Sequence, residues 1–159
     1  MMTITAVPLT AEAFAPFGDV VTHRGEPPLM PCADTFEHTA AATRVTMAVL
    51  RVEAPVRGPV EITRLERHPH SAQTFIPLKG GRSLIVVCGT AADGRPLLAS
   101  ARAFVAGSTQ GVTYRRDVWH RSVTALEAPS EYVVLMVQTE DGSDNLFDDL
   151  DHPLLVEVD

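Results

Sequence analysis

Apolar and polar residues alternate along much of this chain with the period of two that is typical of β-strands. Segments 42–54 (ATRVTMAVLRVEA) and 60–68 (VEITRLERH) alternate in this way and are rich in β-branched residues. Further strand-like runs follow in the order TFIPL, SLIVVCG, RAFVA, GVTYR, SVTALEA and EYVVLMVQ. The pattern therefore predicts a chain built mainly from short strands.

The segments between these runs predict turns, loops and very little helix. Residues 10–17 predict one short helical turn capped by Thr10, and residues 22–41, which contain three prolines and show no clear period, predict a long loop. Gly80 and Gly81 join TFIPL to SLIVVCG and predict a tight hairpin. Frequent turns without long helices favour an all-β fold, an antiparallel barrel or sandwich, over alternating βαβ units.

Length, composition and charge limit the class of protein. The 159 residues suit one domain spanning residues 1–159, and 45% of them are apolar. A net charge of -7 without an obvious basic patch argues against nucleic acid as a partner, and the apolar runs are too short to span a membrane. Acidic residues gathered between positions 140 and 159 predict a solvated C-terminal tail.

The cysteines and the N-terminal residues indicate the cellular compartment of the protein. Cys88 ends the apolar run SLIVVC and is expected to be buried, whereas Cys32 lies in a polar, proline-rich segment. Two such cysteines do not suggest a disulfide framework, and the first residues lack the basic start and apolar core of a signal peptide. We therefore expect a cytoplasmic protein.

Four polar residues from two separate segments are candidates for a functional site. Glu66 and His68 share one face of a strand because their spacing is two, and Gln73 starts the next strand after a turn at Pro69. His120 comes from the later segment GVTYRRDVWHRSV. Alternate residues of a small β-barrel point into its interior, so closure of the barrel predicts that all four converge in one pocket.

Two uses of these groups remain open. Glu66, His68 and His120 are candidate catalytic residues, because an unperturbed imidazole titrates at about 6.5 and suits proton transfer. The same three residues, together with Gln73, are candidate ligands of a divalent metal ion such as Ni, Mn or Zn. An amide oxygen is a poorer ligand than a carboxylate, so such a site would bind its metal more weakly.

Several residues also have purely structural interpretations. His70 is expected to be structural, since a lone histidine in a strand usually is, and Trp119 is expected to be a packing residue. Glu66 has an alternative interpretation as the surface partner of Arg64 or Arg67.

The spacing of the candidate residues resembles a known motif. Glu66-x-His68-x4-Gln73-x6-Gly80 resembles the first motif of the cupin superfamily, H-x-H-x4-E-x6-G, and His120 lies where the second cupin motif has its late histidine. Three blocks in order, PLTAEAFAPFGDVV, LERHPHSAQTFIPLKG and RAFVAGSTQGVTYRRDVWH, together resemble the ureidoglycolate lyase family, also called ureidoglycolate hydrolase.

This resemblance implies a cupin-like β-barrel of the jelly-roll type, a homodimer, and a small carboxylic acid as substrate. The family cleaves ureidoglycolate to glyoxylate and urea in allantoin and purine nitrogen catabolism. The chain departs from the family pattern at Arg115 and Arg121, where the family has histidine, and in the loop around residues 30–43. Two hypotheses follow: a lyase of this type, or a non-catalytic cupin-like domain that binds another small carboxylic acid.

An anionic substrate inside a barrel needs a paired cation, because an unpaired buried charge is very costly. Arg116 has the same strand parity as His120 and is the first candidate, provided that the strand is regular between them. Arg115, Gln73 and Lys79 are the other candidate substrate-binding residues, and Arg121 is a further alternative for the cation.

Overall fold

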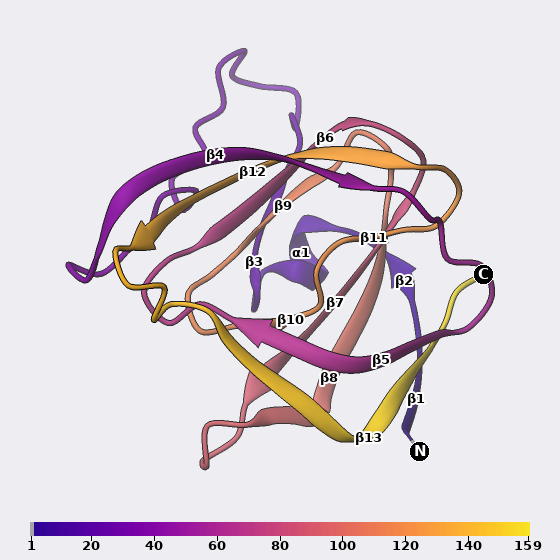
Figure 1. The fold of residues 1–159 in the computed structure, drawn as a ribbon. Coiled ribbons are helices and arrows are strands. Elements are labelled where there is room, and N and C mark those ends of the chain that lie inside the picture. The colour runs from indigo at the N-terminus through magenta and orange to yellow at the C-terminus, as the bar shows by residue number, and fades with distance from the viewer. Residues whose placement is uncertain (1) are drawn as a thin grey trace.

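The computed structural model describes residues 2–159, which form thirteen strands and one short helix arranged as two facing sheets (Figure 1). The larger sheet contains β1 (Met2–Thr5), β2 (Val7–Pro8), β5 (Val60–Arg67), β7 (Ser83–Thr90), β8 (Pro96–Ala106), β10 (Trp119–His120), β11 (Thr124–Ala125) and β13 (Leu146–Glu157). The smaller sheet contains β3 (Gly18–Val21), β4 (Ala42–Val52), β6 (Gln73–Lys79), β9 (Gly111–Tyr114) and β12 (Ser130–Thr139). The predicted all-β architecture is confirmed.

The chain passes repeatedly from one sheet to the other. The strand order is β1-β13-β5-β10-β7-β8-β2 in the larger sheet, with β11 beside β7, and β3-β9-β6-β12-β4 in the smaller sheet. Within residues 2–159, the paired strands run antiparallel except for β1 with β13 and β2 with β8. Because β4, β5, β6 and β7 alternate between the sheets, residues close in sequence face each other across the barrel.

The predicted hairpin at Gly80 and Gly81 is wrong. β6 pairs with β9 and β12, whereas β7 pairs with β8, β10 and β11, so the turn carries the chain from one sheet to the other. Gly80 does adopt a positive φ of 124°, and a Cβ atom there would lie 2.1 Å from the Ser130 hydroxyl oxygen. A glycine turn serves a hairpin and a sheet crossing equally well, so the sequence pattern did not separate the two.

The C-terminal segment is not the solvated tail that its charge predicts. Residues 146–157 form β13, which pairs with β5 on one side and with β1 on the other. Leu154 and Val156 are fully buried, while exposed acidic residues such as Asp149 form ion pairs, in this case with Arg64. Apolar residues interspersed among the acidic ones, in LFDDLDHPLLVE, carry the strand signal that the net charge obscured.

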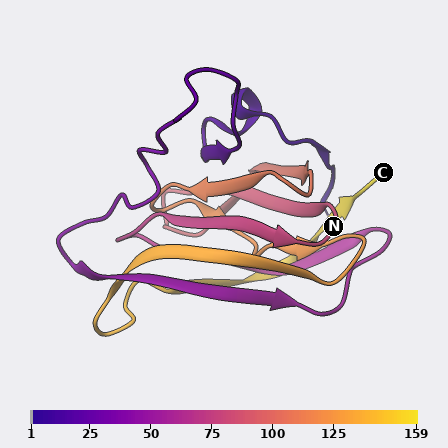
Figure 2. The same ribbon diagram turned by 90° about the horizontal axis from the view of Figure 1, so that it is seen from above.

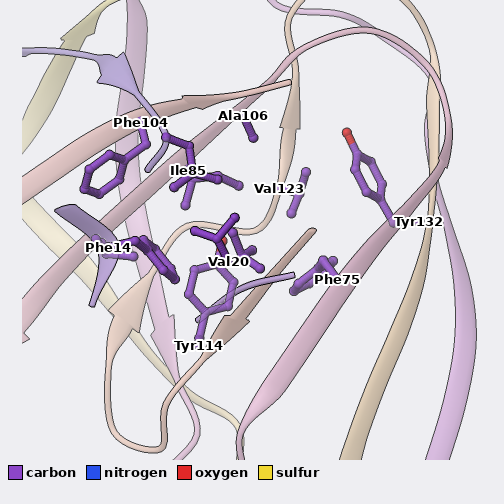
Figure 3. Packing of buried hydrophobic residues seen from close by; sticks show 12 residues of the cluster. Phe14, Val20, Phe75, Ile85, Phe104, Ala106, Tyr114, Val123 and Tyr132 are labelled. Carbon is purple, nitrogen blue, oxygen red and sulfur yellow. The ribbon is translucent and has the colours of Figure 1, made fainter. Parts of the chain in front are cut away.

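One of two hydrophobic clusters lies between the two sheets (Figure 3). The smaller sheet contributes Phe75 and Tyr114, the larger sheet contributes Phe104, and helix α1 (Ala11–Phe14) contributes Phe14. The Phe14 and Phe104 rings pack edge to face with their centroids 5.7 Å apart. Thr10 caps α1 as predicted, because its hydroxyl accepts a hydrogen bond from the backbone N–H three residues later.

The long loop predicted over residues 22–41 is present and stands away from the sheets (Figure 2). It returns to the barrel at a bridge between His38 and Ser71, in the segment that links β5 to β6. None of the helical structure within residues 2–159 is both long and apolar enough to cross a membrane.

Candidate active site

His120 and Glu66 lie directly opposite each other on neighbouring antiparallel strands. His120 ends β10 and pairs with Glu66 of β5, and opposite residues of such strands share one face of the sheet. The His120 Nε2 atom is 3.5 Å from the Glu66 carboxylate. Across the barrel, Gln73 begins β6, and its Oε1 atom lies 3.0 Å from the same nitrogen. Residues of both sheets therefore form the site.

His68 completes the cluster from just beyond the end of β5. Its ring centroid is 5.3 Å from that of His120, and one potential ligand atom from each of Glu66, His68 and His120 lies within 4.8 Å of the other two. Both imidazoles are buried, whereas the Glu66 side chain is 19% exposed. The structure thus brings together the four residues that the sequence placed in one pocket.

Backbone carbonyls orient the two imidazoles. His68 Nδ1 lies 3.0 Å from the Asp144 carbonyl oxygen, and His120 Nδ1 lies 2.9 Å from that of Val118. A carbonyl oxygen only accepts hydrogen bonds, so each Nδ1 carries the donated proton and each Nε2 faces the other groups of the site. Within residues 2–159, the buried Nε2 of His68 has no hydrogen-bond partner. That nitrogen can accept a proton or coordinate a ligand.

Burial and neighbouring charges set the ionisation of the site. Burial disfavours the Glu66 carboxylate, but the hydrogen bond and charge of His120, with His68 and Arg121, hold the pKa of Glu66 below its usual range. Burial and the nearby His120 lower the pKa of His68, although Glu66 acts in the opposite direction. Near neutral pH the site therefore presents an ionised carboxylate beside a neutral His68 imidazole.

The cluster borders an open groove of about 330 Å³. Its polar lining includes Glu66, His68 and Gln73, and its apolar lining comes from β4, β6 and β12, through Ala48, Val49, Leu50, Phe75, Val134 and Met136. This volume lies at the lower end of the range for small-molecule sites. A groove with ionisable groups on one wall and apolar side chains on the other suits a small polar substrate.

Arg116, the first candidate for a carboxylate partner, lies outside this groove. Its guanidinium group donates to the Glu37 carboxylate at 3.1 Å and to the Pro69 carbonyl oxygen at 3.2 Å. The parity argument required one regular strand, but β9 and β10 belong to different sheets and Asp117, between them, has a φ of 68°. The turn at Asp117 therefore breaks the alternation on which the prediction rested.

Two other candidate cations are also held elsewhere. Lys79 lies at the opposite end of β6 from Gln73 and pairs with Glu131 at 3.3 Å. Arg115 donates to the Ala15 carbonyl oxygen at 2.8 Å. Of the four predicted substrate-binding residues, Gln73 is the one that lines the groove.

The structure also shows the contacts of Glu66, His70 and Trp119, for which the sequence allowed purely structural roles. Arg64 and Arg67 each pair with an aspartate instead of Glu66, so Glu66 remains directed to the imidazoles. His70 hydrogen-bonds a threonine of the long loop. Trp119 is buried, and the Arg67 guanidinium group lies 4.9 Å above its ring.

Comparison with known proteins now identifies the family. The sequence model of the ureidoglycolate lyase family matches residues 1–157. The chain is 40% identical over 158 residues to a protein of Agrobacterium fabrum, covering 99% of this chain and 97% of the relative. It is also 40% identical over 141 residues to the ureidoglycolate lyase of Brucella melitensis biotype 2, covering 84% and 82% respectively. This chain belongs to the ureidoglycolate lyase family.

Solved structures that resemble this member of the ureidoglycolate lyase family include RmlC from Streptococcus suis in complex with dTDP-D-xylose. That likeness has a TM-score of 0.43 and 14% sequence identity, and it covers 58% of this chain and 43% of RmlC.

Two residues that the sequence did not single out support the imidazoles of this ureidoglycolate lyase family member. The Tyr114 ring stacks on the His120 ring, with centroids 4.0 Å apart and an interplanar angle of 11°. Asp144 is buried and holds His68 through its backbone carbonyl. Tyr114 could have been found from strand alternation in GVTYR, whereas Asp144 sits in an acidic stretch that carries no such signal.

Proposed function

We propose that this chain cleaves ureidoglycolate to glyoxylate and urea. The observation that carries the proposal is the cluster of Glu66, His68 and His120, whose ligand atoms lie within 4.8 Å of one another beside a groove of small-molecule size. Membership of the ureidoglycolate lyase family over residues 1–157 supports the same substrate.

The reaction needs two proton transfers and consumes no water. A base removes the proton of the hydroxyl group, the oxygen forms the C=O bond of glyoxylate while the C–N bond breaks with its electron pair going to nitrogen, and an acid protonates that nitrogen. One glyoxylate and one urea then leave. His68 suits the role of base, because its pKa is lowered by burial and its Nε2 atom is unpartnered among residues 2–159.

His120 suits the role of acid. Its ring nitrogens face three acceptors: the Val118 carbonyl at Nδ1, and the Gln73 amide oxygen and the Glu66 carboxylate at Nε2. As the acid, His120 would donate its Nδ1–H to the Val118 carbonyl and would hold its second proton on Nε2, between the Gln73 oxygen at 3.0 Å and the Glu66 carboxylate at 3.5 Å, from where it can pass to the departing urea nitrogen. Glu66 stays ionised and stabilises the positive charge of the His120 imidazolium. The carboxylate therefore has a role in the reaction without acting as the base.

We also propose that the same atoms can hold a divalent metal ion of the Ni, Mn or Zn type. Glu66, His68 and His120 would be its ligands, with the Gln73 amide oxygen as a weaker fourth. The unpartnered Nε2 of His68 and the carbonyls that orient both rings fit such an ion. When bound, the ion supplies a Lewis acid that polarises substrate oxygens.

The decisive experiment incubates purified protein with ureidoglycolate and measures glyoxylate and urea together, after subtraction of the spontaneous rate. Equimolar release of both is expected, with a fall of about 10²- to 10⁴-fold in kcat for His120→Ala. Ammonia in place of urea would contradict the proposed bond cleavage. Saturable binding of glyoxylate without turnover would instead support the non-catalytic, carboxylate-binding alternative.

We further propose that the protein forms a homodimer through the outer face of β4. This strand lies at the edge of the smaller sheet, and Val45, Met47 and Val49 on it are 67%, 73% and 61% exposed. An exposed apolar row of this kind is a common site of protein association. Light scattering should give twice the chain mass for the wild type and the single chain mass for Met47→Asp. A monomeric wild type would contradict the proposal.

We infer a cytoplasmic role in allantoin and purine nitrogen catabolism. The free cysteines Cys32 and Cys88 are compatible with a reducing compartment. Deletion of the gene should impair growth with allantoin as the nitrogen source, and normal growth would argue against this role.

A further inference from the structure

With Arg115, Arg116 and Lys79 held elsewhere, the substrate carboxylate still requires a cation, and Arg44 is placed to supply it. Opposite residues of antiparallel strands share a face, and Arg44 of β4 lies opposite Gln138 of β12. Residues of β12 with the parity of Gln138 include Met136, which lines the groove, and Tyr132, which is part of the core between the sheets. Arg44 is therefore on the inward face of the smaller sheet.

A chain of contacts links Arg44 to the cluster. The Gln73 amide nitrogen lies 3.8 Å from the Met136 sulfur, and the Gln138 amide nitrogen lies 3.8 Å from the same sulfur. The Gln138 amide oxygen accepts a hydrogen bond from Arg44 at 2.9 Å. Since Gln73 also contacts His120, one row of side chains leads across the sheet from the imidazole to the guanidinium group.

Two cavities lie along this row of side chains between His120 and Arg44. A second cavity of about 250 Å³, lined by Arg44, shares Met136, Gln138 and Asn145 with the groove beside the cluster. Strand spacing of about 4.8 Å and a rise of about 3.4 Å per residue put the Cα atoms of Arg44 and Gln73 roughly 12 Å apart. The two cavities meet within that interval, at Met136 and Gln138.

The charge of Arg44 is available to a ligand. Its hydrogen bond goes to a neutral amide, and no ion pair within residues 2–159 includes it. A guanidinium group has five N–H donors in a fork that matches a carboxylate. Arg121 is the other cation near the cluster, but the cavity that it lines is only about 40 Å³, close to the space of one water molecule.

We propose that Arg44 binds the carboxylate of the substrate and so determines the preference of this enzyme for 2-hydroxy and 2-oxo acids. The inference rests on the proposed function of the Glu66, His68 and His120 cluster. Arg44 would contact the carboxylate and neither the hydroxyl group nor the departing nitrogen, so its removal should raise KM more than it lowers kcat.

The test compares two inhibitors of ureidoglycolate cleavage that differ in charge. Glyoxylate carries the carboxylate, whereas N-(hydroxymethyl)urea has the carbinol and ureido groups without it. Arg44→Ala should raise KM for ureidoglycolate and the inhibition constant of glyoxylate by about 10- to 100-fold, the range for a charged hydrogen bond. The inhibition constant of N-(hydroxymethyl)urea should not change. Arg44→Lys should recover part of the loss, because it keeps the charge without the fork.

Arg95→Ala is the control, because Arg95 pairs with Asp148 and Asp151 and lines neither the groove nor the cavity beside Arg44. It should change none of these constants. Unchanged constants in Arg44→Ala, or an equal loss for both inhibitors, would overturn the inference, as would a selective loss of glyoxylate binding in Arg121→Ala alone. If the wild type releases no urea from ureidoglycolate, the proposed function fails instead, so the two failures are distinguishable.

Discussion

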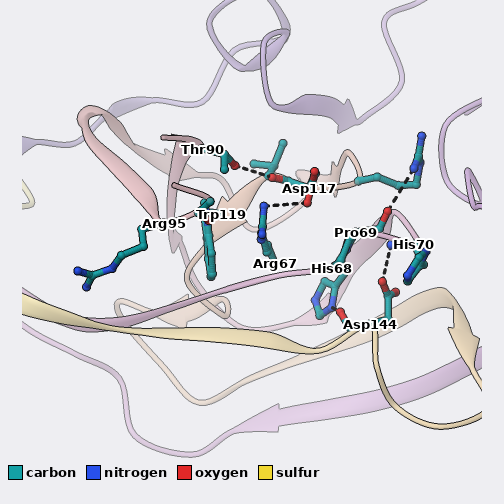
Figure 4. Close-up of polar contacts among 12 residues, drawn as sticks. Arg67, His68, Pro69, His70, Thr90, Arg95, Asp117, Trp119 and Asp144 are labelled. Carbon is teal, nitrogen blue, oxygen red and sulfur yellow. Dashed lines mark hydrogen bonds and ion pairs between the residues drawn. The ribbon is translucent and has the colours of Figure 1, made fainter. Parts of the chain in front are cut away.

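His68 Nδ1 lies 3.0 Å from the backbone carbonyl oxygen of Asp144, so the orientation of one site imidazole depends on the loop between β12 and β13 (Figure 4). The Asp144 carboxylate accepts hydrogen bonds from the His70 N–H and the Ser71 hydroxyl. Asp144 is 1% exposed. One buried residue therefore fastens this loop to the segment that links β5 to β6, and it holds His68 in place.

Replacing Asp144 with asparagine should loosen that attachment. The substitution turns the oxygen that accepts from Ser71 into an N–H donor, so the buried Ser71 O–H loses its carboxylate acceptor while the His70 N–H keeps its partner. We expect the free energy of unfolding to fall by about 1–3 kcal/mol, the range for a buried group left unpaired, and kcat to fall with it. Urea denaturation and glyoxylate release measure the two effects.

Asp141→Asn is the control for this substitution, because Asp141 lies in the same loop with an exposed side chain. It should change stability by no more than about 0.5 kcal/mol. An Asp144→Asn protein as stable as the wild type would show that the hydrogen bonds of the Asp144 carboxylate contribute little to stability.

Gln73→Glu tests whether the site binds metal. A carboxylate is a stronger ligand than an amide, so this variant should retain more Ni, Mn or Zn than the wild type after dialysis. Gln73→Ala should retain less than either. Metal content per chain, measured by atomic emission, decides the outcome. No difference among the three proteins would argue that Glu66, His68 and His120 work by proton transfer alone.

Tyr114→Phe separates the hydroxyl of Tyr114 from its ring. The hydroxyl is buried, and the structure gives it no hydrogen-bond partner within residues 2–159, whereas the ring stacks on His120. Removing an unpaired buried hydroxyl should leave stability unchanged or raise it by about 1 kcal/mol, with activity retained.

Tyr114→Leu removes the stacked ring and is the informative companion. It should lower the free energy of unfolding by about 1–3 kcal/mol and reduce kcat, since the His120 ring loses its support. If the Phe and Leu variants lose activity to the same extent, the hydroxyl has a role that the stacking argument misses.

Cys88 should make the protein less stable at alkaline pH. Burial raises the pKa of its thiol from 9.0 to about 12. Between these values the unfolded chain has released the proton while the folded chain retains it. The contribution is therefore fully present below pH 9 and is lost as pH rises toward 12, with a slope of at most about 1.4 kcal/mol per pH unit.

Denaturation of the wild type and Cys88→Ala from pH 8 to pH 11 measures this effect. The variant should start from a lower stability, because a buried side chain has been shortened, but its stability should fall less steeply with pH. Parallel curves would contradict the assignment to Cys88. At pH 8 the exposed Cys32 should be the thiol that reacts with a disulfide reagent in the folded protein.

The sequence by itself determined the strand content and the identity of the cluster. Alternation of apolar and polar residues predicted the strands, because burial of one face leaves that period in any half-buried strand. The spacing of Glu66 and His68 put them on one side of the chain, and three sequence blocks in order indicated the family. These are local properties of the chain, so they can be predicted without knowing how the strands pair.

Only the tertiary structure decided which sheet each strand joins and which distant residues support the cluster. The turn at Gly80 is compatible with a hairpin and with a sheet crossing, and the choice depends on pairing with β12, about fifty residues later. Asp144 and Arg44 carry no local signal, because their positions follow from the register between β4, β12 and the loop after it. Arg116 was misplaced for the same reason: a single residue with positive φ, Asp117, turned the chain between two sheets and ended the alternation. Long-range pairing, which no local pattern encodes, fixes these positions.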